Sequence, residues 1–475
     1  MQPRARLRLT AMVVASALFM QNIDSTAVAT ALPSMARDFG IPLVQLSAAI
    51  TAYLLALTVF IPVSGWVADR YGAKRVFLCA IALFSASSML CALSSGLAPL
   101  VAGRVLQGLG GAMMVPVARL LLFKGARREE ILDATTWLTM PALLGPLLGA
   151  PLGGFLTDVM SWRSVFWINV PLGAVGMALT WRFIEASPPS SSPPAPDLRG
   201  MGLTGVAIAL FMVGVETIGR SLLPRGMPEI CMLLAVGLFV LSVAHCRKVA
   251  HPAIDYALLR IPAFYVASVV GGLFRVGAGA LPFIVPLTLQ LSFGLSASHS
   301  GMLSLATALG SLCMRPLVRT GLSILRARTI LLLGSLVFAA ALLLCAVMDA
   351  RWPAYAVFGV LLLAGLAQAF SFATLGALAF VDVPPEKLSA ATSFHVTAQQ
   401  LARAAGVAMA ALGMEMSMHV AGRSQLALAD FAAAFTLVSV VVLMSVPLYL
   451  SMDRDVGGGL VRKKGDAGRS SEHGR

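Results

Sequence analysis

Charged side chains are scarce in this sequence of 475 residues. Asp, Glu, Lys and Arg make up 12% of it and hydrophobic residues 58%, whereas a soluble domain carries about a quarter charged and about half apolar residues. The mean hydropathy is +0.86. This surplus of apolar surface excludes an ordinary soluble enzyme or nucleic-acid-binding domain. It predicts an all-α, polytopic bundle of membrane-spanning helices surrounded by lipid.

Sequence patterns for ATP hydrolysis and for common catalytic sites are also missing. There is no Gly-Lys dipeptide, so the phosphate loop G-x-x-x-x-G-K-[ST] is absent, as are H-E-x-x-H and G-x-S-x-G. The six cysteines lie in or at the ends of apolar segments and form no C-x-x-C pair. They indicate core packing, with neither a disulfide framework nor a metal site. We therefore expect no enzyme activity, no cofactor and an ion gradient as the source of energy.

Fourteen segments are long and apolar enough to be membrane spans, for which about 20 mostly apolar residues are needed. They are residues 10–33, 47–68, 76–95, 97–123, 132–157, 164–184, 200–219, 229–246, 263–291, 298–318, 328–347, 353–381, 388–416 and 430–450. Their spacing predicts two six-helix halves with an inserted hairpin, an organisation common in transporters. The predicted units are an N-terminal half (1–184), a Pro/Ser-rich cytoplasmic linker (185–199), the transmembrane hairpin (200–246), a C-terminal half with its preceding cytoplasmic loop (247–450) and a disordered cytoplasmic tail (451–475).

The distribution of Lys and Arg predicts the orientation. With the N-terminus placed in the cytoplasm, the cytoplasmic segments hold 25 Lys and Arg residues and the outer loops 6, and 4 more lie inside spans. Positive residues collect on the cytoplasmic side of membrane proteins. Both termini are therefore expected in the cytoplasm, and the net charge of +14 needs no nucleic-acid partner to explain it.

Ionisable residues inside the spans are the first candidates for a coupling site, because charge is costly in lipid. Asp24 precedes the predicted span end at Pro33 by about 13 Å, and Arg104 lies about 10 Å into its own span, at ~1.5 Å per residue. The two opposite charges are thus expected at similar depth on different helices. A buried acid beside a cation can bind and release a proton as water access alternates. The alternative is a static ion pair that only holds the bundle together.

Two further arginines, Arg275 and Arg403, are predicted deep inside later spans. We expect them to face a wet cavity between the two halves and, with Gln21 and Gln399, to contact a substrate. The open alternative is that their guanidinium groups donate hydrogen bonds to backbone carbonyls between helices.

Five local patterns carry a resemblance to a known family. They are Asp24-Ser25-Thr26 through Ala31-Leu32-Pro33, Gly65 through Arg75, Arg104 with Gln107-Gly108, Gly145 through Gly154, and Trp162-Arg163 through Pro171. In this order and on these spans they are similar to the motifs of the major facilitator superfamily, in particular of its 14-helix EmrB/QacA-type drug:proton antiporters. Two stretches, 110–117 and 275–290, resemble the MdtD-like branch of that group.

The resemblance implies the major facilitator fold, here two six-helix halves plus an inserted two-helix hairpin. It also implies roles for two groups of residues. The loop motif would form a cytoplasmic gate and comprises Gly65, Asp69, Arg70, Gly72 and Arg75, and the helix motif associated with export comprises Gly145, Pro146, Gly149, Gly153 and Gly154. Glycines at every fourth position of the helix motif form a flat stripe that a neighbouring helix can approach closely.

The expected function is proton-coupled antiport that exports amphipathic small molecules across the bacterial inner membrane by alternating access, with Asp24 and Arg104 as the coupling pair. The alternatives are an exporter of one endogenous metabolite and a transport-inactive sensor or scaffold. The predicted outer loop 417–429 is short, unlike that of the EmrB type. The resemblance therefore leaves a periplasmic adaptor possible but doubtful.

Overall fold

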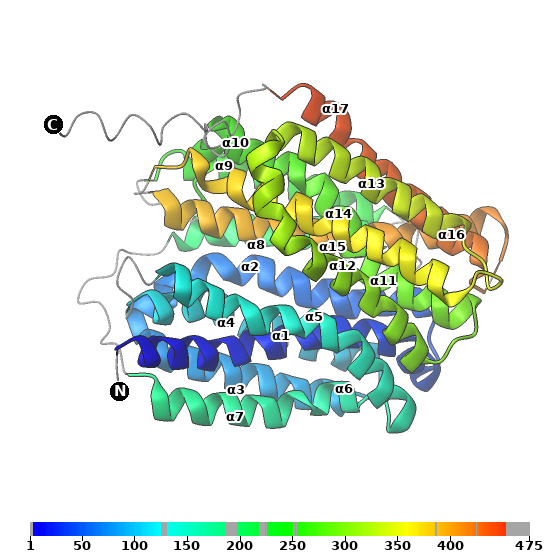
Figure 1. Cartoon of the computed structure of the whole chain (residues 1–475), viewed down its shortest axis with the longest axis horizontal. Helices are drawn as coiled ribbons and strands as arrows, with labels where there is room; N and C mark the ends of the chain where they lie inside the picture. Colours follow the sequence, from blue (N-terminus) through cyan, green and yellow to red (C-terminus); the bar gives the residue numbers. More distant parts are fainter. Residues whose placement is uncertain are drawn as a thin grey trace.

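The computed structural model describes residues 3–124, 131–185, 197–217, 224, 226–249, 252, 254–384, 387–423 and 425–452. These residues form helices and no strand. The helices lie side by side in one bundle, in which α1 begins and α17 ends toward the same end (Figure 1). We call that end the terminal face and the other end the opposite face.

The first half of the chain forms seven helices and one short 3-10 turn. They are α1 (Pro3–Phe39), the turn Leu43–Leu46, α2 (Ser47–Tyr71), α3 (Ala73–Ala92), α4 (Leu97–Lys124), α5 (Ile131–Val159), α6 (Ser164–Trp167) and α7 (Asn169–Phe183). The sharp connection between α2 and α3 depends on Gly72, whose φ is +88°, a conformation that glycine adopts without a steric penalty.

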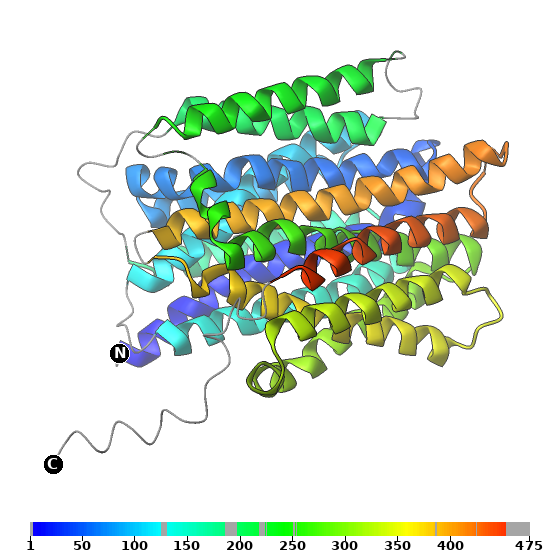
Figure 2. The same ribbon diagram turned by 90° about the horizontal axis from the view of Figure 1, so that it is seen from above.

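The inserted hairpin consists of α8 (Leu198–Thr217) and α9 (Met227–Cys246). It lies along one side of the bundle, seen at the top of Figure 2. Helix α8 packs against α9, and also against α2 of the first half and α15 of the second. The hairpin therefore covers one side of the junction between the two halves.

The second half of the chain contains the remaining helices and two π turns. They are the 3-10 turn Tyr256–Arg260, α10 (Pro262–Tyr265), the π turn Val266–Val270, α11 (Gly271–Leu287), the π turn Thr288–Ser292, α12 (Ala297–Ile324), α13 (Ala327–Val347), α14 (Ala354–Val381), α15 (Leu388–Val420), α16 (Leu428–Leu443) and α17 (Ser445–Leu450). The first membrane span of this half runs without a break from the start of α10 to the end of the second π turn, over the 31 residues Pro262–Ser292.

The predicted set of fourteen spans is confirmed. Within the described part of the chain, eleven helical segments are long and apolar enough to cross a membrane. The other three predicted spans correspond to α5, α12 and α15, which are 29, 28 and 33 residues long. Most of the predicted linker and tail, residues 186–196 and 453–475, lie outside the described part of the chain.

The predicted end of the first span at Pro33 is wrong, because α1 continues through this proline to Phe39. Proline is tolerated within membrane helices when neighbouring groups satisfy the backbone carbonyl that it frees. The last turn is held in place by Asp38, which accepts hydrogen bonds from Trp162 Nε1 at 3.0 Å and Arg163 Nη1 at 2.7 Å. Asp24 is consequently the middle residue of the span Leu9–Phe39, about 22 Å from its end and not about 13 Å.

Candidate functional site

Asp24 and Arg104 meet inside the first half of the bundle. Arg104 Nη1 donates to Asp24 Oδ2 at 2.6 Å, and the two side chains are 1% and 0% exposed. The other carboxylate oxygen, Oδ1, accepts hydrogen bonds from Gln107 Nε2 at 2.9 Å and from Asn169 Nδ2 at 2.8 Å. The structure therefore joins the two predicted charges in one buried polar network at the centre of the bundle.

Local sequence positions the two amide donors. Gln107 lies one helical turn after Arg104 on α4, and its Oε1 accepts from Arg104 Nη1 at 2.6 Å. Asn169 is the first residue of α7 and is separated from the short α6 by one residue. Ser88 Oγ on α3 accepts from the amide nitrogens of Gln107 and Asn169, at 2.6 and 3.2 Å. Helices α1, α3, α4 and α7 thus all contribute to the surroundings of one carboxylate.

Arg104 also has partners other than the carboxylate. Its Nε donates to the backbone carbonyl of Ala49 at 3.0 Å. Its guanidinium carbon lies 4.3 Å from the centre of the Tyr53 ring, within the range of a cation–π contact. Together with Asp24 and Gln107, the guanidinium therefore has four partners, and a change of charge at Asp24 would change the balance of its contacts without removing all of them.

Arg275 lies in the second half, 3% exposed and close to the middle of its 31-residue span. Its Nη1 donates at 2.8 Å to the carbonyl of Ala267, which lies in the π turn preceding α11. Its Nη2 lies 3.4 Å from His395 Nε2. A hydrogen bond from Arg275 to a backbone carbonyl was the alternative that the sequence left open. That alternative placed the carbonyl between helices, whereas Ala267 belongs to the same span as Arg275.

Arg403 lies one residue from the middle of the 33-residue α15, yet its side chain is only partly buried. Its Nη1 donates to Gln400 Oε1 at 3.2 Å. Gly279 on α11 packs directly against the Arg403 backbone, where an added Cβ would lie 2.6 Å from its Cα. Gln399 is also partly buried, whereas Gln21 is 8% exposed and its Oε1 has no hydrogen-bond partner among the described residues.

A separate apolar groove lies beside the hairpin. Its volume is about 300 Å³, and its lining comes from α2, α4 and α8, including Ala56, Val105 and Gly205. Its lining contains none of the four residues predicted to contact substrate. In this conformation Arg275 and Gln21 are packed inside protein.

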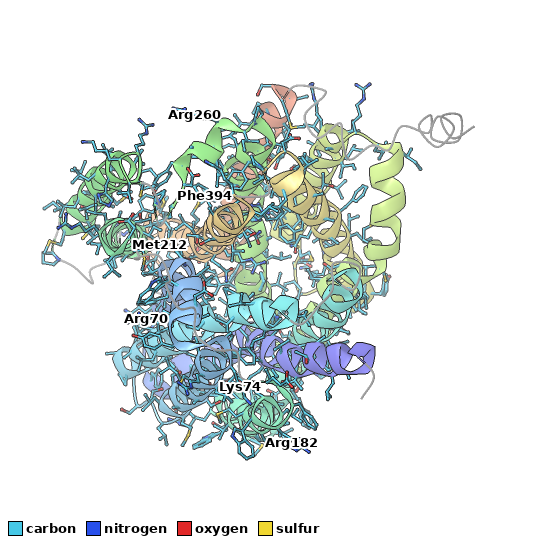
Figure 3. All side chains as sticks on the ribbon, turned by 90° about the vertical axis from the view of Figure 1, so that its left-hand side faces the viewer. Arg70, Lys74, Arg182, Met212, Arg260 and Phe394 are labelled. Atoms are coloured by element: carbon cyan, nitrogen blue, oxygen red, sulfur yellow. The ribbon has the colours of Figure 1, made fainter. Side chains whose placement is uncertain are left out.

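The loop motif lies at the terminal face. Arg70 and Lys74 project there from the first half, together with Arg182 of α7, and Arg260 lies on the same face in the second half (Figure 3). Lys74 Nζ donates to the carbonyl of Trp181 at 2.9 Å. These positive side chains, spread over the terminal face, agree with the charge distribution expected for a cytoplasmic surface.

The glycine stripe of α5 packs against α1. An added Cβ would lie 2.5 Å from Asn22 Cβ at Gly145 and 2.6 Å from Ala27 Cα at Gly153, and at Gly149 it would collide with the Thr26 hydroxyl. The stripe therefore brings α5 against the helix that carries Asp24.

Gly154 faces a different neighbour. A Cβ at this position would collide with the carbonyl of Ala297 in the second half. Pro146 lies within α5, between Gly145 and Gly149. Helix α5 therefore contacts α1 through one face and α12 through the next.

Hydrogen bonds between described residues join the two halves at the opposite face. Asp158, at the end of α5, accepts from the backbone nitrogens of Ala297 at 3.3 Å and Ser298 at 2.7 Å, the first two residues of α12. Gln290 Nε2 donates to the carbonyl of Thr30 at 2.9 Å. A buried apolar cluster that includes residues of both halves, among them Leu32 and Phe283, adds to this contact. The structure is thus closed at this face.

Several residues of the polar network had no role assigned from the sequence. Gln107 and Asn169 belong to motifs that the sequence revealed, so their polar character within a span was the available signal. Ser88 and Tyr53 had no such signal, because serine and tyrosine are common in membrane helices. His395 also had no role assigned from the sequence, but it is 2% exposed and contacts Arg275.

Comparison with known proteins agrees with this architecture. The sequence profile described as Major Facilitator Superfamily matches residues 14–407. The chain is 34% identical over 453 residues to the MdtD protein of Pectobacterium carotovorum, covering 94% of this chain and 96% of the relative. It is also 34% identical over 472 residues to the MdtD protein of Klebsiella pneumoniae, covering 97% and 98% of the two chains. Both relatives are named as multidrug resistance proteins.

Solved structures share the fold at low sequence identity. A POT family transporter in complex with 5-aminolevulinic acid has a TM-score of 0.70 at 14% identity, over 92% of this chain and 94% of the other. A D-xylose–proton symporter has a TM-score of 0.68 at 14% identity, over 95% and 98% of the two chains. With its fourteen spans, the chain is a multi-pass membrane protein that belongs to the Major Facilitator Superfamily and resembles the MdtD multidrug resistance proteins.

Proposed function

We propose that the protein is a proton-coupled antiporter that exports amphipathic small molecules across the bacterial inner membrane. The observation that carries this proposal is the buried acid Asp24 at the middle of its span, paired with Arg104 and two amides. An ionisable group held at this depth is costly and tends to serve ion movement. The MdtD relatives support export of drug-like molecules as the direction and class of transport.

The proposed cycle uses one protonation event. In the closed network the carboxylate accepts hydrogen bonds from Arg104, Gln107 and Asn169. Protonation removes its negative charge and converts one oxygen into a donor, which weakens the pair with Arg104. Arg104 keeps Ala49 and the Tyr53 ring as partners. The proton therefore alters how tightly α1 is held to α4 without unfolding the half.

Because the opposite face is closed, we assign this conformation to the part of the transport cycle in which the protein opens toward the cytoplasm. The Lys and Arg distribution supports a cytoplasmic location for the terminal face and both chain ends. The hydrogen bonds between Asp158 and the start of α12 would then lie on the periplasmic side. By family resemblance, the loop motif with Asp69 and Arg70 would stabilise the alternative, outward-facing state. The two faces would then close in turn around Arg104 and Asp24.

The test of this proposal is drug–proton exchange in everted vesicles. Asp24→Asn preserves the shape of the side chain and abolishes the charge, so the protein should fold and gradient-driven exchange should fall to background. The matched control is Asp38→Asn on the same helix. Asp38 forms an ion pair with Arg163, and 44% of the aspartate side chain is exposed. Such exposed pairs contribute about 0–1 kcal/mol, so exchange should persist. Undiminished exchange by the Asp24→Asn protein would rule out this acid as the coupling site.

A further inference from the structure

We propose that the substrate carries an anionic group, such as a carboxylate, and that Arg275 and Arg403 bind it between the two halves. This inference rests on the proposed transport function and specifies the substrate class for it. It concerns the second half of the protein, whose buried charges the proton cycle does not use.

The charges at mid-depth do not balance. Asp24 and Arg104 neutralise each other in a direct ion pair. Arg275 and Arg403 also lie near the middle of their spans, but neither makes an ion pair with a carboxylate among the described residues. The four groups together carry two positive charges in excess. Buried charge of one sign is costly unless a partner neutralises it.

The partners of Arg275 hold it without neutralising it. They are a backbone carbonyl, the His395 ring and the face of Phe372, whose centre lies 5.7 Å from the guanidinium carbon. Because arginine can only donate, the contact with His395 Nε2 requires that this nitrogen carries no proton. The other ring nitrogen, Nδ1, then donates to Ser268 Oγ at 2.9 Å. His395 is therefore a neutral residue that positions Arg275.

Arg403 lies where the two halves meet. Helix α15 packs against α2 of the first half and α11 of the second, and Arg403 remains partly accessible although it lies at mid-span. Across the junction, the Tyr53 hydroxyl and Gln21 Oε1 are buried and lack hydrogen-bond partners among the described residues. The two side chains lie close to Gly111. A Cβ added at Gly111 would be 3.3 Å from the Tyr53 hydroxyl and 3.2 Å from Gln21 Nε2.

These features favour an anion over a cation. An anion entering between the halves would meet unneutralised guanidinium donors, which form short, bidentate hydrogen bonds with carboxylates. The hydroxyl of Tyr53 could donate to the same ligand, and the amide of Gln21 has both donor and acceptor atoms. A cationic amphipath would instead add to the excess positive charge. The arrangement therefore selects by charge, while apolar walls would accept varied carbon skeletons.

The experiment measures dye binding to the purified full-length protein by fluorescence polarisation. Fluorescein and rhodamine 123 share a xanthene ring system but are an anion and a cation, respectively, near neutral pH. Fluorescein should bind at least tenfold more tightly. Arg275→Gln and Arg403→Gln should each weaken its binding about tenfold or more, a factor that corresponds to 1.4 kcal/mol. Arg403→Lys should retain more affinity than Arg403→Gln, because the charge remains.

The matched control is Arg351→Gln, an exposed arginine in the loop between α13 and α14, which should bind fluorescein as the unmodified protein does. Gel filtration and circular dichroism identify any variant that fails to fold. Because Arg403 is partly exposed, its two variants keep the test decisive if Arg275→Gln misfolds. Equal or tighter binding of rhodamine 123, no binding of fluorescein at millimolar concentration, or unchanged fluorescein affinity in the folded arginine variants would overturn the inference.

Vesicle transport separates this inference from the proposed function. If a cationic dye is exported in exchange for protons in an Asp24-dependent manner, antiport stands and the anion-binding inference falls. If fluorescein binding depends on Arg275 and Arg403 but fluorescein transport is independent of the proton gradient, the anion site stands and proton coupling falls. The two results have opposite consequences for the two proposals, so the failure of one can be distinguished from the failure of the other.

Discussion

At the scale of single residues, the network around Asp24 balances desolvation against hydrogen bonding. The ion pair with Arg104 is inaccessible to solvent, so neither group can turn to water for solvation. Breaking a buried pair by removing one partner costs about 3–5 kcal/mol, because an uncompensated charge remains. The pair therefore contributes to stability as well as being a candidate coupling site, and the two roles need separate measurements.

A double-mutant cycle measures the structural role independently of transport. Arg104→Gln should lower the free energy of unfolding by about 3–5 kcal/mol, because Asp24 keeps its charge and loses its cation. Adding Asp24→Asn removes the stranded charge, so the double variant should be more stable than Arg104→Gln alone. Thermal unfolding of the purified proteins measures both effects. A double variant whose losses simply add would show that the pair contributes no mutual stabilisation.

The sequence analysis identified the two charges of this pair from residue type and span position alone. It placed Asp24 too close to the membrane surface because it ended the first span at Pro33, whereas tertiary contacts of Asp38 extend α1 to Phe39. The environment of Arg275 was beyond prediction. Its carbonyl partner depends on a π turn, and its contact with His395 joins residues 120 positions apart.

At the scale of helices, glycine spacing determines how closely α5 approaches α1. Leu32 and the other apolar residues of α1 would pack against many helix surfaces, but Gly145, Gly149 and Gly153 leave room for backbone contact at successive turns. In lipid, where apolar surface gains little from burial between helices, such close packing is a main source of association. The glycine repeat could be recognised in the sequence, but the helix that packs against it could not be predicted.

Replacing one glycine of the stripe tests this packing. Gly149→Leu should push α5 away from α1, since even a Cβ would collide with Thr26, and overpacking costs typically about 1–3 kcal/mol. Gly237→Leu on α9 is the control, because an added Cβ there meets no atom within 4 Å. The melting temperatures of the two purified variants should differ clearly, with the control near the unmodified protein. Equal melting temperatures would contradict close packing at Gly149.

At the scale of the whole molecule, the two halves must separate at one face as they join at the other. The contact between Asp158 and α12 has a simple physical basis, because the carboxylate accepts hydrogen bonds from the first two backbone nitrogens of α12. An acid at a helix N-terminus gains about 0.3–2 kcal/mol from the helix dipole. This is enough to bias an equilibrium between conformations whose free energies differ by a few kcal/mol.

Asp158→Asn should therefore shift the population toward conformations open at the opposite face, by about two- to thirtyfold for a loss of 0.3–2 kcal/mol. A cysteine introduced at Gln290, which contacts Thr30 across the same junction, reports the opening through its rate of reaction with a membrane-impermeant maleimide in intact cells. Background from the six native cysteines is measured in the protein without the added cysteine. Asp38→Asn, a charge removal on the same face, should leave the rate unchanged. If Asp158→Asn also leaves it unchanged, the contact with α12 does not hold the halves together, and closure of this face must depend on the apolar cluster around Leu32 and Phe283.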